Sequence, residues 1–128
     1  MIYKGHHYIL DASEAYGLDA NWLLESMNEV ATKVGTTVVF KTSVKLPVTD
    51  GLSPPGFTSV CLLDESHLTA HYYEDKGLLA IDAFTCGSID KAADIIYRLK
   101  NILSTACVGI KFYEGKLQRR FPHVDPKC

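Results

Sequence analysis

Hydrophobic and polar positions follow two periods along this chain. Stretches rich in β-branched and aromatic residues, with polar residues alternating between them, are typical of strands. Six such stretches predict strands at about 6–13, 36–46, 57–63, 66–73, 78–84 and 105–113. Between the second and third lies 47–56, which holds three prolines and two glycines and predicts a loop.

Two further stretches have apolar residues at helical spacing. The first predicts a helix over 20–34, with Asp19 as N-cap and Gly35 ending it. Its apolar face contains Leu23, Met27, Val30, Ala31 and Val34. The second predicts a helix near 89–103, capped by Ser88. Its apolar face contains Ile89, Ala92, Ala93, Ile96, Leu99 and Leu103.

The predicted order is therefore β-α-β-β-β-β-α-β. A strand-rich chain with two amphipathic helices favours a two-layer α/β (α+β) sandwich, a mostly antiparallel sheet with both helices on one face. The 47–56 loop is too short to link two cores, so we expect residues 1–128 to form a single domain.

Composition and charge narrow the class of protein. The formal net charge is −2 and no block of Lys or Arg stands out, so neither nucleic acid nor a membrane is expected as a partner. The N-terminus lacks a signal-peptide pattern, and no apolar run approaches a membrane span. The four cysteines are widely spaced, which favours free thiols and a cytoplasmic protein.

The turns predict which residues face one another. If 74–77 is the turn between two strands, Cys86 lies diagonally beside Ser66. If Asp64-Glu65 is a tight turn, Thr58 faces His71. Ser66 and His71 are then about 16 Å apart along one strand. The two pairs meet only if the strand bends sharply or if a second copy supplies one of them, as in a two-fold dimer with antiparallel 66–73 strands.

The segment LLDESHLTAHYYEDKGLLAIDAFTCG (62–87) resembles the signature of the prokaryotic S-adenosylmethionine decarboxylase proenzymes. That family's signature has a Glu-Ser-His cleavage site, a histidine five residues after the serine, and a Phe-Thr-Cys-Gly segment further on. Glu65-Ser66-His67, His71 and 84–87 match these parts in residue type and spacing.

The resemblance implies a proenzyme that cuts itself between Glu65 and Ser66, giving a β chain of 1–65 and an α chain of 66–128. Ser66 becomes a pyruvoyl group, the only cofactor expected, which binds the substrate amine as a Schiff base in polyamine (spermidine) biosynthesis. His71 matches the base of the processing reaction, Cys86 the proton donor in turnover, and Thr58 the hydroxyl that supports the processing oxyanion. The family forms homodimers with shared active sites.

Each of these residues also has an ordinary structural interpretation. Ser66 could be a turn serine, Cys86 a small buried residue, His71 a strand histidine and Thr58 a strand threonine. No metal is expected, because His67 and His71 would lie about 13 Å apart in a strand.

The adenosyl pocket departs from the family pattern. After the histidine, where the family has a Thr-Trp-Pro-Glu-like stretch, this chain has Tyr73, Glu74 and Asp75 at the last three positions. The position of the adenine-stacking aromatic is Leu52, and Phe57 could replace it. Glu65 could also line the pocket. An extra carboxylate suits arginine or ornithine, which stay open as substrates beside S-adenosylmethionine. An uncleaved, non-catalytic binding homologue is the third possibility.

Overall fold

The computed structural model describes residues 4–46, 54–116, 120 and 123 of this chain. It has six strands and two helices in the predicted order within those residues. They are β1 (Gly5–Ser13), α1 (Ala20–Lys33), β2 (Val38–Leu46), β3 (Gly56–Leu63), β4 (Ser66–Tyr73), β5 (Leu78–Cys86), α2 (Lys91–Ala106) and β6 (Lys111–Lys116).

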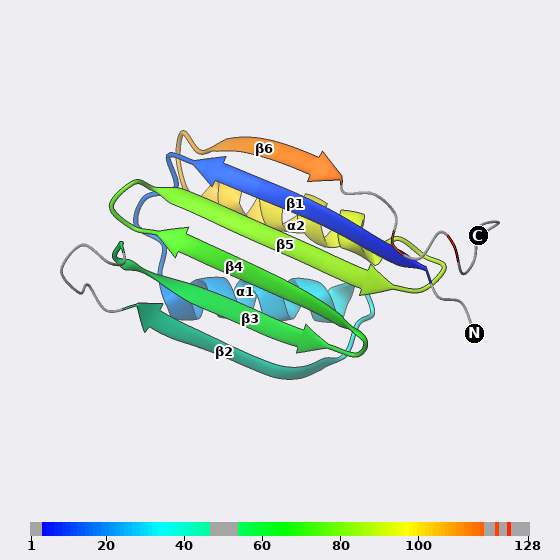
Figure 1. Cartoon of the computed structure of the whole chain (residues 1–128). Helices are drawn as coiled ribbons and strands as arrows, with labels where there is room; N and C mark the ends of the chain where they lie inside the picture. Colours follow the sequence, from blue (N-terminus) through cyan, green and yellow to red (C-terminus); the bar gives the residue numbers. More distant parts are fainter. Residues whose placement is uncertain (1–3, 47–53, 117–119, 121–122, 124–128) are drawn as a thin grey trace.

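The strands form one antiparallel sheet in the order β2-β3-β4-β5-β1-β6. The hairpin β3–β4 pairs Thr58 with His71, as the tight turn at 64–65 predicts. The hairpin β4–β5 pairs His67 with Phe84, which is the register that the turn at 74–77 predicts. β4 therefore lies inside the sheet, with a strand on each side (Figure 1).

Both helices cover the same face of the sheet, which confirms the two-layer α/β sandwich (Figure 1). On β4 this face carries Leu68, Ala70 and Tyr72, each 2% exposed or less. The helices bury their apolar stripes against it, and the core is continuous between the layers. The core residues of the helices are Leu23, Leu24, Met27, Val30, Ala31, Ala92, Ile95, Ile96, Leu99 and Leu103.

The other side of the sheet, which we call the open face, is covered by neither helix (Figure 1). Side chains alternate across a strand, so the residues between the buried ones point to this side. On the three central strands the open face consists of Thr58, Val60, Leu62, His67, Thr69, His71, Tyr73, Leu78, Ala80, Asp82, Phe84 and, at the strand end, Cys86.

The first helix agrees with the sequence pattern. The Asp19 carboxylate accepts a hydrogen bond from the Trp22 N–H at 2.9 Å, and Gly35 follows the helix with φ 89°. Glycine reaches that left-handed conformation without a Cβ clash, which is why the chain can turn away there.

The second helix corrects the prediction at both ends. Its N-cap is Asp90, whose carboxylate accepts from the Ala93 N–H at 3.1 Å, and not Ser88. Ile89 precedes the helix and is 67% exposed, so it is not part of the apolar face. Ile95 occupies the core instead. At the other end the helix continues to Ala106, and the last strand begins at Lys111 rather than at 105.

Candidate functional site

The turn between β3 and β4 is a tight two-residue connection. Leu63 pairs directly with Ser66, which leaves Asp64 and Glu65 as the turn. Glu65 has φ 59°, in the left-handed region that residues with a Cβ rarely adopt. That conformation costs roughly 1–2 kcal/mol for a residue other than glycine. The strained residue supplies the carbonyl of the Glu65–Ser66 peptide bond.

The Ser66 hydroxyl contacts the end of β5. Its oxygen accepts a hydrogen bond from the Cys86 backbone N–H at 3.1 Å. Ser66 also lines a cavity of about 140 Å³ between the sheet end and the helices. The cavity is lined by Gly35, Thr36, Thr37, Asp64, Ser66, Cys86 and Lys91. Cys86 thus lies next to Ser66 as the register predicts, and the contact between them is made by the Cys86 backbone N–H and not by its thiol.

The Cys86 thiol is half-buried at the same end of the sheet. Its residue also lines an adjoining cavity of about 180 Å³ with Gly87, Ser88, Ile89 and Lys91. Burial, and after it the nearby Glu65 carboxylate, raises the pKa of the Cys86 thiol, while the Arg120 guanidinium opposes that rise. Cys86 is therefore a protonated thiol at neutral pH, the state that a proton donor needs.

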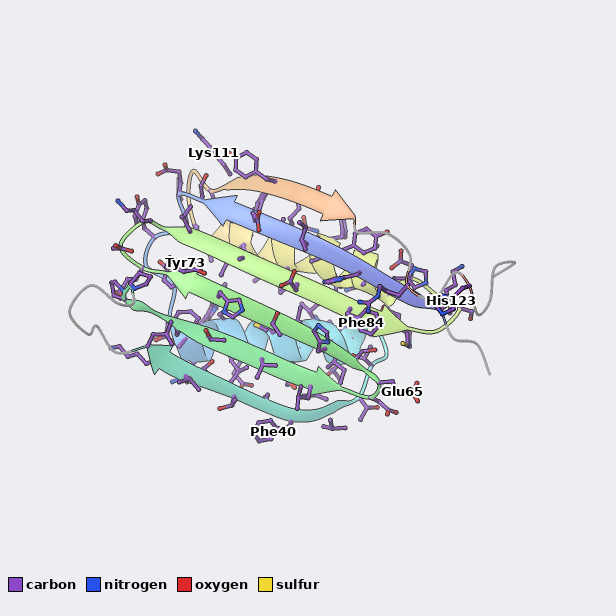
Figure 2. The ribbon with its side chains drawn as sticks, in the orientation of Figure 1. Phe40, Glu65, Tyr73, Phe84, Lys111 and His123 are labelled. Atoms are coloured by element: carbon purple, nitrogen blue, oxygen red, sulfur yellow. The ribbon has the colours of Figure 1, made fainter. Side chains whose placement is uncertain are left out.

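Thr58 and His71 form a second polar pair on the open face. The Thr58 Oγ1 and His71 Nδ1 atoms are 3.0 Å apart, so the two side chains share a hydrogen bond. His71 lies five residues along β4 from Ser66, about 16 Å in an extended strand. The pairs Ser66/Cys86 and Thr58/His71 therefore lie toward opposite ends of β4 and do not meet within one chain. Figure 2 shows this span between its labelled residues Glu65 and Tyr73.

The predicted substrate residues lie mostly at the His71 end. Tyr73 is 36% exposed at the end of β4, and Glu74 and Asp75 are exposed in the following turn. Glu74 lines a cavity of about 260 Å³ that also includes Asp19, Lys45 and Phe57.

The structure does not support the predicted role of Phe57, and the position of Leu52 is not described. The Phe57 ring points to the helix side and is 6% exposed, packed against the Tyr72 ring at 5.1 Å between centroids. It is a core side chain in this structure, so its stacking role is unsupported by its placement. Leu52 lies outside the described residues.

Sequence reasoning missed an aromatic and basic group on the open face near Cys86. The Phe84 ring packs with His67 at 5.5 Å and with His7 at 6.1 Å between centroids. The Arg120 guanidinium lies 5.5 Å from the centre of the Phe84 ring. Burial and the neighbouring His7 lower the pKa of His67, which favours the neutral imidazole. Arg120 has no local motif, so no sequence signal could have placed it there.

Within residues 4–46, 54–116, 120 and 123, no cluster of three or more His, Cys, Asp or Glu side chains has the geometry to hold a metal ion. None of the helices in those residues is long and apolar enough to cross a membrane.

Comparison with known proteins assigns the family. The model of the S-adenosylmethionine decarboxylase family matches residues 6–114, and the chain belongs to this family. A Symbiobacterium thermophilum protein named S-adenosylmethionine decarboxylase proenzyme is 39% identical over 111 residues, which cover 84% of this chain and 79% of that protein.

Two other comparisons add to this. A Pseudomonas aeruginosa protein of the same name is 32% identical over 87 residues, and the match spans only 51% of its length. The crystal structure of the adenosylmethionine decarboxylase from Aquifex aeolicus superposes with a TM-score of 0.64 at 21% identity, covering 88% of this chain and 89% of that one. That likeness confirms the fold.

Proposed function

We propose that this chain is a self-processing, pyruvoyl-dependent decarboxylase that acts on S-adenosylmethionine in polyamine (spermidine) biosynthesis. The observation that carries the proposal is the hairpin end, where the strained Glu65 precedes Ser66 and the Ser66 hydroxyl contacts Cys86. A serine that follows a strained residue and a cysteine on the neighbouring strand end are the parts that the family resemblance requires. The proposed location in the cytoplasm stays a prediction.

Self-cleavage uses the Ser66 side chain as the nucleophile. The hydroxyl oxygen attacks the Glu65 carbonyl carbon, the peptide C–N bond breaks, and an ester joins the two residues. Removal of the Ser66 Cα proton then expels the Glu65 carboxylate, which splits the chain into 1–65 and 66–128. Addition of water and loss of ammonia leave a pyruvoyl group at residue 66. The left-handed Glu65 favours this reaction because cleavage releases its strain.

The residues at the hairpin end suit that group and its reaction. A pyruvoyl group supplies an electrophilic carbonyl that accepts the electrons left when carbon dioxide departs. Cys86 holds a proton beside residue 66 and gives it to the carbon that has lost carbon dioxide. Glu65, exposed in the turn, remains as the carboxylate end of the first fragment, where it can contact the substrate.

A homodimer with shared sites accounts for the distance between the two polar pairs. β4 has neighbours on both edges, so two β4 strands can meet only through their open faces. That face and its extension onto β2 and β6 carry exposed apolar side chains: Phe40, Val44, Leu62, Tyr73, Leu78 and Tyr113. A two-fold axis near the middle of β4 would bring the end of β4 that carries Ser66, with Cys86 beside it on β5, over the partner subunit's His71. There the imidazole acts as the processing base, and Thr58 of the partner subunit supports the oxyanion.

The intact mass of the denatured protein tests self-processing. We expect two fragments, 1–65 and 66–128, with the second lighter than its sequence by one ammonia. Ser66→Ala removes the nucleophile, and we expect that variant to remain a single chain of unchanged mass. A wild-type chain that also stays whole after long incubation would contradict the proposal and favour the non-catalytic binding homologue.

One observation favours arginine or ornithine as a second candidate substrate. Two acidic side chains, Glu74 and Asp75, are exposed at the His71 end of β4. Carboxylates bind a guanidinium or ammonium group well, whereas aromatic stacking contributes more to the binding of an adenosine than an additional carboxylate does. Release of carbon dioxide from each of the three substrates by the cleaved enzyme separates the candidates. Turnover of only arginine or ornithine would replace S-adenosylmethionine as the substrate.

A further inference from the structure

Arg120 lies beyond the family match at 6–114, yet the fold brings it to the Ser66/Cys86 site. The Arg120 N–H donates to the Gly5 carbonyl at 3.0 Å, and the Gly5 N–H donates to the Arg120 carbonyl at 3.4 Å. Gly5 in turn pairs with Cys86 on β5. Arg120, Gly5 and Cys86 therefore form a row across three neighbouring segments at one end of the sheet.

The small size of Gly5 allows the Arg120 side chain to reach the β5 side. A Cβ atom at Gly5 would lie 2.7 Å from Phe84 Cε1 and 2.8 Å from Arg120 Cβ, both too close for real contacts. Without that atom, the Arg120 guanidinium lies 5.5 Å from the centre of the Phe84 ring, in cation–π range. The backbone pairing and the ring together fix a positive charge near Cys86.

Three other charged groups lie near Cys86, and each is placed differently from Arg120. Glu65 in the β3–β4 turn acts on the thiol in the opposite sense to Arg120. Asp64 and Lys91 line the cavity that Cys86 shares with Ser66. The Lys91 ammonium donates to the Gly35 carbonyl at 3.1 Å, which directs it to the end of α1.

The imidazoles of His7 and His67 belong to the same surroundings, since they pack on the Phe84 ring. Burial holds His67 toward its neutral form by lowering its pKa. Among the described residues, Arg120 is the one cation whose charge lowers the pKa of the Cys86 thiol and so favours the thiolate.

We propose that Arg120 is a positioning residue for Cys86, its guanidinium held over Gly5 on the Phe84 ring so that it stabilises the thiolate left after proton donation. The proposal rests on the proposed role of Cys86 as proton donor. In that step the S–H bond breaks and a C–H bond forms at the carbon that has lost carbon dioxide. The thiolate then takes a proton from water. A fixed cation lowers the energy of the thiolate, so the donor gives its proton more readily.

The test is the pH dependence of Cys86 alkylation in the full-length protein. Cys61 and Cys107 are buried, and Cys128→Ser removes the remaining thiol, so iodoacetamide reports on Cys86. In Arg120→Gln we expect the midpoint to move to higher pH and the rate near pH 8 to fall roughly two- to fivefold. Arg120→Lys keeps the charge and should recover most of the rate. The pH profile of decarboxylation should move in the same direction.

Two controls separate this effect from a general loss of charge. Arg98→Gln removes a cation that is paired with Asp94 on the outer side of α2, and Lys91→Gln removes one from the shared cavity. Both should leave the Cys86 midpoint near that of the parent. A larger shift in Lys91→Gln, or an unmoved midpoint in folded Arg120→Gln, would overturn the proposal.

The pH profile of decarboxylation decides whether the effect of Arg120 on Cys86 matters for the reaction. An unmoved decarboxylation profile beside a shifted alkylation midpoint would also overturn the positioning role. The alkylation measurement needs neither cleavage nor turnover, so its outcome is separate from failure of the proposed function, which the intact mass reveals.

Discussion

Two cysteines of the same sheet differ in how far they are exposed. Cys86 is half-buried at the strand end, between a carboxylate and a guanidinium. Cys61 points into the core and is 0% exposed. Burial raises the pKa of the Cys61 thiol to about 11, with a smaller opposing effect from Lys41. Burial raises the pKa of both thiols, so the difference is access: a reagent or substrate can reach the half-buried Cys86 and not the fully buried Cys61.

The buried Cys61 predicts a loss of stability at high pH. Its thiol ionises near pH 9 in the unfolded chain and near pH 11 in the folded one. The stability is thus intact below about pH 9 and falls as pH rises toward 11, by up to roughly 2–3 kcal/mol. The measurement is urea unfolding between pH 8 and pH 11. Cys61→Ala should show a shallower fall, and an equally steep fall in that variant would contradict the assignment to Cys61.

The ends of the second helix illustrate what an element needs beyond its own sequence. Asp90 caps α2 and also accepts a hydrogen bond from the Tyr8 hydroxyl at 2.7 Å, so the cap is tied to β1. Ser88 is exposed and precedes the cap by two residues. Both serine and aspartate are favourable N-caps, so the local sequence could not choose between them. Asp90 also makes the contact with Tyr8, a residue far away along the chain.

Substitution at the two candidate caps tests this correction. Asp90→Ala removes the acceptor for the Ala93 N–H and for the Tyr8 hydroxyl, so we expect a loss of roughly 1–3 kcal/mol in the free energy of unfolding. Ser88→Ala should change it by less than about 0.5 kcal/mol. Chemical denaturation of both variants gives the comparison, and equal losses would show that the cap is not Asp90 alone.

At the scale of the whole molecule, the two-layer fold leaves one sheet face without helices and places the two polar pairs toward opposite ends of β4 (Figure 2). One copy therefore holds the nucleophile and thiol at one end and the imidazole and hydroxyl at the other. The proposed dimer through the open face would unite them. In that dimer each site would depend on residues of both subunits.

Co-expression of two inactive variants tests the shared site. Ser66→Ala lacks the nucleophile, and His71→Ala lacks the proposed base, so we expect each alone to stay uncut. In a mixed dimer the His71→Ala chain would meet the intact His71 of the partner subunit. Random pairing at equal expression should then allow cleavage of about half of the His71→Ala chains.

The masses of the two chains under denaturing conditions give this result. The control pairs Ser66→Ala with the double variant Ser66→Ala, His71→Ala. Neither chain of this control has Ser66, so both should stay whole. An uncut His71→Ala chain in the mixture, or full cleavage of His71→Ala by itself, would contradict sharing across the interface.

The sequence by itself determined the elements whose cause is local. The strand and helix periods, the Asp19 cap and the Gly35 stop follow from near neighbours, and the lengths of two turns set both hairpin registers. For that reason the Thr58–His71 contact and the position of Cys86 beside Ser66 could be predicted, as could the family from the motif around Ser66, but not that the Cys86 backbone N–H makes the contact.

The tertiary structure alone decided contacts between segments far apart in the chain. It selected Asp90 as the cap and buried Phe57 on Tyr72. It also paired Arg120 with Gly5 beside Cys86. Each of these contacts depends on which surfaces pack together. The hydrophobic pattern of a single segment does not determine the free energy of that packing. The motif thus specifies the residues proposed to react, while the fold supplies their surroundings.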